Sequence, residues 1–313
     1  MKKVSVIILT YNASWEKLKA TIRSILLQEE IDYEIVFADD GSARNWKEEI
    51  TQMLKGNGVA YRFAFLENNS GTVRNVSNGL DAADGEYIKL ITPGDFLYDR
   101  KTLCSWVAFM EEMESQVSFG DAVFYNDESG QPAPIAGTPA PANRMLFDLP
   151  QNREDVFVDY LLANDTVLGA SLLMRADLMR QYLQLIVDKV KYAEDYMLRL
   201  IIFDQVTVHY YRKKTIWYEY GTGISTGKES RWAQRLQQDF AATDEILKER
   251  GTAPDAVAEK YLAYLKNDSS NPLLHKLKKT AAFPGISKWR KQMELAAKTP
   301  TDVDTAYLKG LFQ

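Results

Sequence analysis

Strand-like and helix-like segments alternate over about the first 90 residues of this chain, and this alternation constrains its fold more than any other feature. Four short apolar runs rich in β-branched residues are typical of strands buried on both faces of a parallel sheet. They are residues 4–9, 33–38, 61–66 and 87–91. Helix-like segments lie between them, marked by Leu18, Ile22, Ile25 and Leu26 and by residues 46–54 and 73–83. Strands that alternate with helices predict βαβ units and a parallel sheet.

The rest of the chain is less regular. Further strands are expected at 119–125, 206–211 and 215–220, helices at 177–187 and 194–203, and a Pro- and Gly-rich loop at 130–142. Beyond residue 228 strand signals are few, helix formers are many, and glycine and proline interrupt them. We therefore expect an α/β domain of residues 1–228, followed by a helical appendage of three or four short helices at 229–313.

Composition excludes several classes of protein. The 313 residues suffice for one large domain with a smaller appendage. A net charge of −5 argues against a nucleic-acid-binding protein, which usually has a basic surplus. The single cysteine, Cys104, fits a reducing compartment. Neither a signal peptide nor a run of roughly 20 apolar residues is evident, so we expect a cytoplasmic protein.

Several familiar catalytic motifs are absent. The chain lacks the dinucleotide fingerprint G-x-G-x-x-G after its first strand, and it lacks the phosphate-binding loop G-x-x-x-x-G-K-[ST]. It also lacks the nucleophile elbow G-x-S-x-G. His209 and His275 are its only histidines, and His209 lies within an aromatic strand where a structural role is favoured. A dehydrogenase, a P-loop enzyme and a triad hydrolase are thus disfavoured.

Polar side chains instead follow the predicted strands, where open parallel sheets bind their ligands. The first strand ends in Thr10-Tyr11-Asn12, the second in Asp39-Asp40-Gly41-Ser42 and the fourth in Thr92-Pro93-Gly94-Asp95. Each motif alone could be a helix or turn cap. Together they predict one site at one edge of the sheet.

These motifs resemble, in order and spacing, the family 2 glycosyltransferases of the bacterial, non-processive type. Residues 69–75 (NSGTVRN) and 85–88 (GEYI) match the next segment of that family, and Glu194-Asp195 is similar to its catalytic acidic motif. The resemblance covers about residues 1–226. It implies a GT-A fold, which is a Rossmann-like mixed α/β sheet flanked by helices. It also implies inverting transfer of a hexose from a UDP-sugar to a hydroxyl of a glycan, glycoprotein or lipid-linked acceptor.

The resemblance also implies roles for individual residues. Those expected at the donor are Thr10, Tyr11, Asn12, Asp39, Gly71, Arg74, Thr92, Gly94 and Asp95. Within this set Tyr11 would lie against the base, Asp39 would accept a hydrogen bond from uracil, and Arg74 would sit beside the base or pyrophosphate. Asp195 would be the general base. Residues expected at a lid or at the acceptor are Gly169, Ala170, Glu194, Tyr220 and Ser225.

One motif departs from the family. Relatives often carry Asp-x-Asp where this chain has Thr92-Pro93-Gly94-Asp95, so only Asp95 is left to bind a divalent cation, Mn²⁺ or Mg²⁺, that bridges the donor phosphates. This loss motivates an alternative, a catalytically inactive nucleotide-sugar-binding module or scaffold. A nucleotidyltransferase would have a Gly-rich basic loop after the first strand, and residues 10–14 form no such loop.

Residues 271–292 carry six Lys or Arg and no Asp or Glu, interleaved with large apolar residues. A basic amphipathic segment of this kind could bring the enzyme to anionic lipid at the inner face of the membrane. The simpler interpretation, which we favour, is a helix with a solvated basic face packed on the α/β domain.

Overall fold

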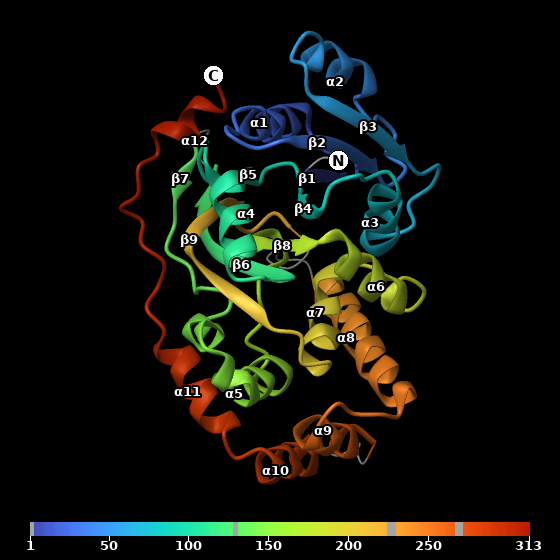
Figure 1. Ribbon diagram of the computed structural model, residues 1–313, viewed down its shortest axis with the longest axis vertical. Coiled ribbons are helices and arrows are strands. Elements are labelled where there is room, and N and C mark those ends of the chain that lie inside the picture. The colour runs from blue at the N-terminus through green and yellow to red at the C-terminus, as the bar shows by residue number, and fades with distance from the viewer. Residues whose placement is uncertain (1–2, 128–130, 224–229, 267–271) are drawn as a thin grey trace.

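The computed structural model describes residues 3–127, 131–223, 230–266 and 272–313, and Figure 1 shows its arrangement. The four strands predicted near the N-terminus are present, and the first two extend to the polar residues that follow them. They are β1 (Val4–Thr10), β2 (Tyr33–Asp39), β3 (Ala60–Phe65) and β4 (Tyr87–Ile91). All pair in parallel, β3 with β2, β2 with β1 and β1 with β4.

Both faces of this parallel sheet are buried, as the continuous apolar runs predict. Successive side chains of a strand point to opposite faces. In β1, Val6 and Ile8 belong to the core under the helices α1 (Trp15–Leu26) and α4 (Thr102–Glu112). Ile7 and Leu9 belong to the core on the other face, with α3 (Thr72–Asp81) and α6 (Ala176–Ile186).

Beyond β4 the sheet becomes mixed, which confirms the predicted fold class. Its order is β3-β2-β1-β4-β8-β6-β9-β5, with β7 on β6. The added strands are β5 (Phe96–Leu97), β6 (Val117–Asn126), β7 (Ala133–Pro134), β8 (Leu172–Arg175) and β9 (Val208–Glu219). Strand β8 is antiparallel to both β4 and β6, whereas β9 is parallel to β6.

The two strands predicted at 206–211 and 215–220 are in fact one, β9. It pairs with β6 from Val208 to Glu219, and the register shifts on either side of Asp121 absorb the intervening polar residues. The helix predicted at 194–203 begins as a 3₁₀ turn, Glu194–Tyr196, and continues as α7 (Met197–Phe203).

The remaining helices are shorter or lie toward the C-terminus. They are α2 (Lys47–Leu54), α5 (Arg153–Val158), α8 (Ser230–Arg250), α9 (Ala256–Lys266), α10 (Pro272–Ala282), α11 (Ile286–Leu295) and α12 (Ala306–Gly310). Short 3₁₀ turns occupy Arg144–Asp148, Pro150–Asn152 and Gly169–Ser171, and a π-helical turn occupies Asp159–Ala163. The prediction of three or four short C-terminal helices is wrong, because the described part of that region has five and α8 alone has 21 residues.

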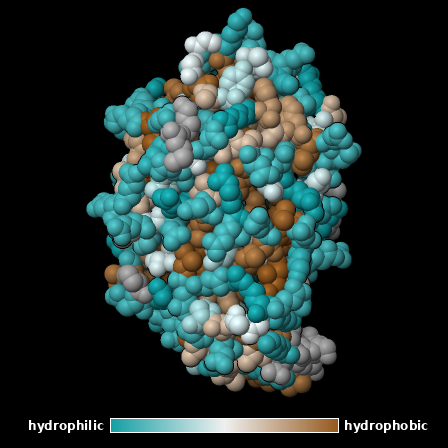
Figure 2. Space-filling model, turned by 45° about the vertical axis from the view of Figure 1, so that its right-hand side comes forward, coloured by the Kyte–Doolittle hydropathy of each residue, from teal (hydrophilic) through white to brown (hydrophobic). Residues whose placement is uncertain are grey.

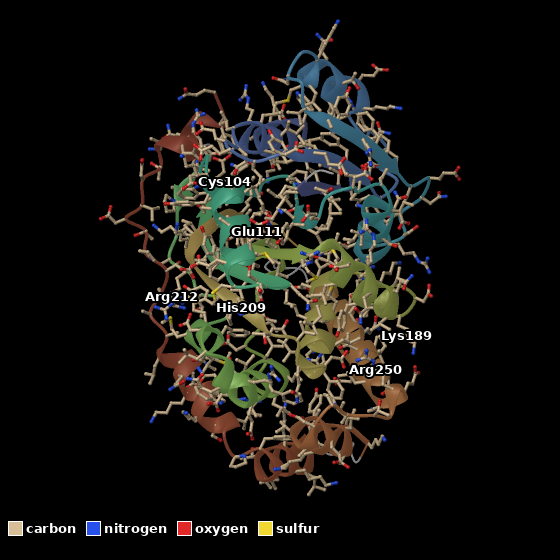
Figure 3. The ribbon with its side chains drawn as sticks, viewed as in Figure 1. Cys104, Glu111, Lys189, His209, Arg212 and Arg250 are labelled. Carbon is tan, nitrogen blue, oxygen red and sulfur yellow. The ribbon has the colours of Figure 1, made fainter. Side chains whose placement is uncertain are left out.

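The C-terminal helices pack along the α/β core rather than apart from it. Figure 1 shows α8 beside α6 and α7, α9 and α10 at the lower end, and the chain returning to place α12 beside α1. Leu247, Tyr261 and Trp289 belong to the same buried cluster as Ile7 of β1. The C-terminal end of α8 is fixed by ion pairs, Arg250 with Asp204 and Lys189 with Glu249 (Figure 3). Whether residues 1–228 and 229–313 are separable units stays a prediction.

In the described ranges, no helix has the length and apolar character needed to cross a membrane.

Candidate active site

A cleft of about 760 Å³ opens at the carboxyl ends of β1 and β4. This volume is in the range typical of small-molecule sites. Of the residues predicted for the site, those on its wall are Thr10, Tyr11, Asn12, Thr92, Asp95, Gly169, Ala170, Glu194, Asp195 and Tyr220.

On the face in Figure 2, hydrophilic residues cover most of the surface and hydrophobic ones gather in patches near its middle.

The first two strands are joined at this edge by hydrogen bonds around Asp39. Its Oδ2 accepts from the hydroxyls of Thr10 at 2.7 Å and Ser42 at 2.6 Å, while its Oδ1 accepts from the N–H of Ser42 at 2.7 Å. Asn12, at φ +49°, donates its N–H to Ser42 Oγ at 2.7 Å. Next to this network Tyr11 is 53% exposed and faces the cleft.

Asp40, rather than Asp39, reaches the wall of the cleft. Its carboxylate accepts the N–H of Ser70 at 2.7 Å and of Gly71 at 3.0 Å, which fixes the loop before α3. Burial raises the pKa of Asp40, and the two N–H donors oppose that rise. Gly71 has φ +95°, and a Cβ there would lie 2.6 Å from the carbonyl oxygen of Lys191. Only glycine therefore allows this loop to approach the segment that leads to Asp195.

Asp95 is 4% exposed and is held by its own loop and by β9. Its Oδ2 accepts from Thr92 Oγ1 at 2.8 Å and its Oδ1 from the N–H of Glu219 at 3.1 Å. Burial raises the pKa of Asp95 to about 6, against the opposing effect of these two donors. Gly94, at φ +106°, leaves a space where a Cβ would collide with Oε2 of Glu219.

The carboxylate of Glu219 thus occupies the space that a side chain at position 94 would need. Both its oxygens accept from Lys17 Nζ, at 2.6 and 2.7 Å. Lys17 and Glu219 both line the cleft. Beneath them, fully buried Lys89 donates to the carbonyl of Leu90 at 2.8 Å and to that of Ala170. Burial lowers the pKa of Lys89 to about 7, and Asp95 opposes this shift.

Glu194 and Asp195, on the 3₁₀ turn before α7, also line the cleft. The N–H of Gly169 donates to the carboxylate of Asp195, and a Cβ at Gly169 would lie 3.2 Å from Oδ2 of Asp195. Desolvation by burial raises the pKa of both acids, and the charge of Asp195 raises that of Glu194 further. A carboxylate with a raised pKa is a stronger proton acceptor once it is ionised.

Four residues predicted for the donor do not reach the cleft wall. Asp39, Gly71 and Gly94 lie just behind it, and their effects are on the shape of the loops. Arg74 is exposed on α3 and pairs with Asp188 at 2.8 Å. Ser225 lies outside the described residues, as does part of the glycine-rich segment around it. The donor contacts of all these residues remain predictions.

His209 takes no part in the cleft. In β9 (Figure 3), its Nδ1 lies 2.9 Å from Ser115 Oγ, and burial lowers its pKa.

Sequence reasoning missed Lys17, Asp40 and the position of Glu219. Asp40 stands in the motif that follows the second strand, but the sequence gives no role to it or to Glu219. The Lys17–Glu219 pair joins residues 202 positions apart, so no local pattern could reveal it.

The described residues contain no group of three or more His, Cys, Asp or Glu side chains that could hold a metal. Two carboxylates, Asp95 and Glu219, together with the hydroxyl of Thr92, nevertheless border one place at the end of β4. Mg²⁺ is commonly held by one or two carboxylates with substrate phosphates completing its shell. Both oxygens of Asp95 already accept hydrogen bonds and both oxygens of Glu219 accept from Lys17, so a hard cation bound together with a diphosphate would have to share or displace those donors.

The mixed sheet, with a cleft at the carboxyl ends of its parallel strands, has the GT-A architecture. The family described as "Glycosyl transferase family 2" matches residues 5–180, more than half of the chain, and the chain belongs to this family.

Two solved structures of S. aureus TarS share this fold. The structure of S. aureus TarS 1–349 in complex with UDP-GlcNAc has a TM-score of 0.56 at 18% identity, over 94% of this chain and 84% of that one. The same fragment with UDP has a TM-score of 0.53 at 18% identity, over 93% and 90%. At this identity the likeness shows the fold alone.

A Campylobacter jejuni protein named GalNAc(5)-diNAcBac-PP-undecaprenol beta-1,3-glucosyltransferase is 33% identical over 97 residues. The match covers 31% of each chain, so this chain spans about a third of that curated relative.

Proposed function

We propose that this glycosyltransferase moves a hexose from a UDP-sugar to an acceptor hydroxyl with inversion, and that Asp195 is its general base. The observation that carries the proposal is one cleft lined both by Asp95, which follows β4, and by Asp195, on the turn before α7. A nucleotide diphosphate needs charge neutralisation as it departs, and a hydroxyl nucleophile needs a proton acceptor. The cleft has a candidate for each task.

The uridine would bind at the ends of β1 and β2. The exposed ring of Tyr11 is suited to lie against a base, and Thr10 and Asn12 support it through Asp39 and Ser42. Because Asp39 already accepts three hydrogen bonds, uracil would have to share or displace one of these donors. The UDP-GlcNAc and UDP complexes of TarS favour a UDP-sugar here as well.

At the reacting centre Asp195 would accept the proton of the acceptor hydroxyl as its oxygen attacks the anomeric carbon. The new carbon–oxygen bond forms on the face opposite the breaking bond to UDP, which inverts the configuration. The N–H of Gly169 donates to the carboxylate of Asp195 and opposes the rise of its pKa. The charge of Asp195 raises the pKa of Glu194 further, so Glu194 keeps its proton to a higher pH than Asp195 does. Asp195 is thus the acid of the pair suited to be ionised at neutral pH.

Family 2 enzymes commonly use a divalent cation, and we propose that Mn²⁺ or Mg²⁺ binds here at Asp95, with Glu219 as the second carboxylate. A cation so bound would neutralise the charge that develops on departing UDP. Lys17 brings a further positive charge to the same place through its ion pair with Glu219. Glu219 would thus supply a carboxylate that the Thr92-to-Asp95 motif lacks.

The acceptor side would lie near Gly169, Ala170 and Tyr220, whose ring is 47% exposed. The C. jejuni relative has a polyprenyl-pyrophosphate-linked glycan in its name, which favours a lipid-linked acceptor and action at the inner face of the membrane. Residues 271–292 would offer limited apolar contact with lipid, because Phe283, Ile286 and Trp289 are buried in the core. Leu274 and Leu277 are exposed.

A panel of UDP-sugars, each with Mn²⁺ or with EDTA, tests this proposal through UDP release and through calorimetric binding of UDP. We expect slow, metal-dependent hydrolysis of one donor and weaker UDP binding by Tyr11→Ala. Leu277→Ala serves as the matched control, because it removes an exposed side chain from α10. Binding of UDP without turnover of any donor, even with glycan and lipid-linked acceptors present, would favour the inactive binding module instead.

A further inference from the structure

A carboxylate from the C-terminal helices holds the backbone that leads into the catalytic turn. Asp239 of α8 is 4% exposed and accepts the N–H groups of three consecutive residues. Its Oδ1 accepts from Lys191 at 2.9 Å, and its Oδ2 accepts from Tyr192 at 2.7 Å and Ala193 at 3.0 Å. Glu194 and Asp195 follow directly.

The same segment is held from its other side by the loop expected to bind the donor. The carbonyl oxygen of Lys191 accepts the N–H of Val73 at 3.2 Å, in the first turn of α3. Gly71 lies against the Lys191 carbonyl with no room for a side chain. Residues 191–193 are therefore clamped between α8 and the donor loop, and a displacement of α8 would be passed on to both.

Aromatic contacts strengthen this attachment to α8. Tyr192 packs edge-on against Trp232 with ring centroids 5.2 Å apart, and Tyr196 packs against Phe240 at 5.8 Å. These rings fix the position of α8, but among the described residues it is Asp239 that accepts the N–H groups of the segment. An unpaired buried N–H is costly, so the segment would rearrange if this carboxylate were lost.

We propose that Asp239 is a positioning residue for the general base, fixing residues 191–193 so that Asp195 faces the acceptor. The inference rests on the proposed role of Asp195. It also gives the helical appendage a part in catalysis, because the residue that orients the catalytic turn comes from α8.

The charge of Asp239 has a second effect, on proton affinity. Asp239 raises the pKa of Asp195 and of Glu194 by like-charge repulsion, in addition to the larger effect of burial. The other ionisable groups that face Asp195 are Glu194, Tyr160, Tyr196 and, beyond the two tyrosines, Arg199. Removing the charge of Asp239 lowers the pKa of Asp195, so the acid limb of the activity profile moves to lower pH.

The test compares Asp239→Asn and Asp239→Glu with Glu245→Gln, a control on an exposed side chain of the same helix. Three readouts are needed: UDP binding, amide hydrogen exchange at residues 191–193, and kcat against pH. For Asp239→Asn we expect kcat to fall on the order of 10- to 100-fold, since small misplacements of catalytic groups cost this much. We also expect faster exchange at 191–193, an acid limb at lower pH, and a loss of UDP affinity that is smaller than the loss of kcat.

Asp239→Glu keeps the charge but changes the reach, so its kcat should fall while its acid limb stays with the parent. It also serves if the Asn variant does not fold. Parental exchange and turnover in Asp239→Asn would overturn the proposal, as would lower turnover without a shift of the acid limb. Asp195→Asn, assayed alongside, separates the two claims. If that variant is inactive, such results overturn the role of Asp239 alone, whereas an active Asp195→Asn overturns the general base and this inference with it.

Discussion

Replacement of Trp289 by alanine should destabilise the whole molecule and not only its C-terminal end. Trp289 lies in α11, is 4% exposed, and packs in the cluster that holds Tyr160, Leu161 and the inner side chains of the sheet. The backbone carbonyl of Trp289 accepts a hydrogen bond from Asn143 Nδ2 at 3.2 Å, and alanine keeps this carbonyl. Its indole N–H has no hydrogen-bond partner among the described residues, so the loss is one of packing.

The expected cost is about 3–5 kcal/mol, the range for truncation of a buried tryptophan. For 313 residues the unfolding entropy is about 0.65 kcal/mol per kelvin, so Tm should fall by about 5–8 °C. The assay is thermal unfolding followed by calorimetry and by circular dichroism, with and without UDP. Leu277→Ala, at 66% exposure, is the control, and should change stability by less than about 0.5 kcal/mol.

A single unfolding transition, with a Tm that UDP raises and that Trp289→Ala lowers, would mean that residues 1–228 and 229–313 unfold together. Two transitions, with UDP acting on one and the substitution on the other, would refute the reasoning. They would show that the shared core contributes little and that the appendage is a separate domain.

Three further outcomes follow from the site. Burial raises the pKa of Asp195, so kcat should fall as pH drops through that raised pKa and should level off above it; a profile flat from pH 5 to 8 would argue against the assignment. Gly71→Ala should destabilise by about 1–2 kcal/mol through its positive φ and weaken UDP binding by pushing the Lys191 carbonyl away, as urea unfolding and calorimetry would report. Glu219→Gln should break the ion pair with Lys17 and lower the affinity for Mn²⁺ in the presence of UDP, as measured by electron paramagnetic resonance. Unchanged affinity would leave Asp95 as the one protein carboxylate on the cation.

The parts of the fold that could be predicted are those whose signal is local. Strands β1 to β4 are buried on both faces, so each is a nearly continuous apolar run that stands out in the sequence. Strand β8 has four residues and β5 has two, and each is defined by a distant partner: Met174 pairs with Ile88, and Phe96 with Trp217. Such short strands have no periodicity of their own, and nothing in the sequence near them indicates the pairing.

The same division holds for the site. Thr10, Asp95 and Asp195 were predicted because they follow recognisable elements, and the structure brings all three to one cleft. Glu219 of β9 contacts Lys17 of α1, and Asp239 of α8 accepts the N–H of Lys191. Both contacts join residues far apart in the sequence, so they form only when the chain folds. Arg74 pairs with Asp188 at the surface, and its place beside the base or pyrophosphate stays a prediction.

The most direct test of the central claim is the turnover of the preferred UDP-sugar by Asp195→Asn compared with the parent, with UDP affinity measured on the same samples. Asparagine keeps the shape of the side chain and can still accept the N–H of Gly169, so folding and donor binding should be retained. We predict a loss of kcat of about 10²- to 10⁴-fold at equal UDP affinity, the usual contribution of a general base. Turnover within a few-fold of the parent would contradict the account and show that another group takes the proton.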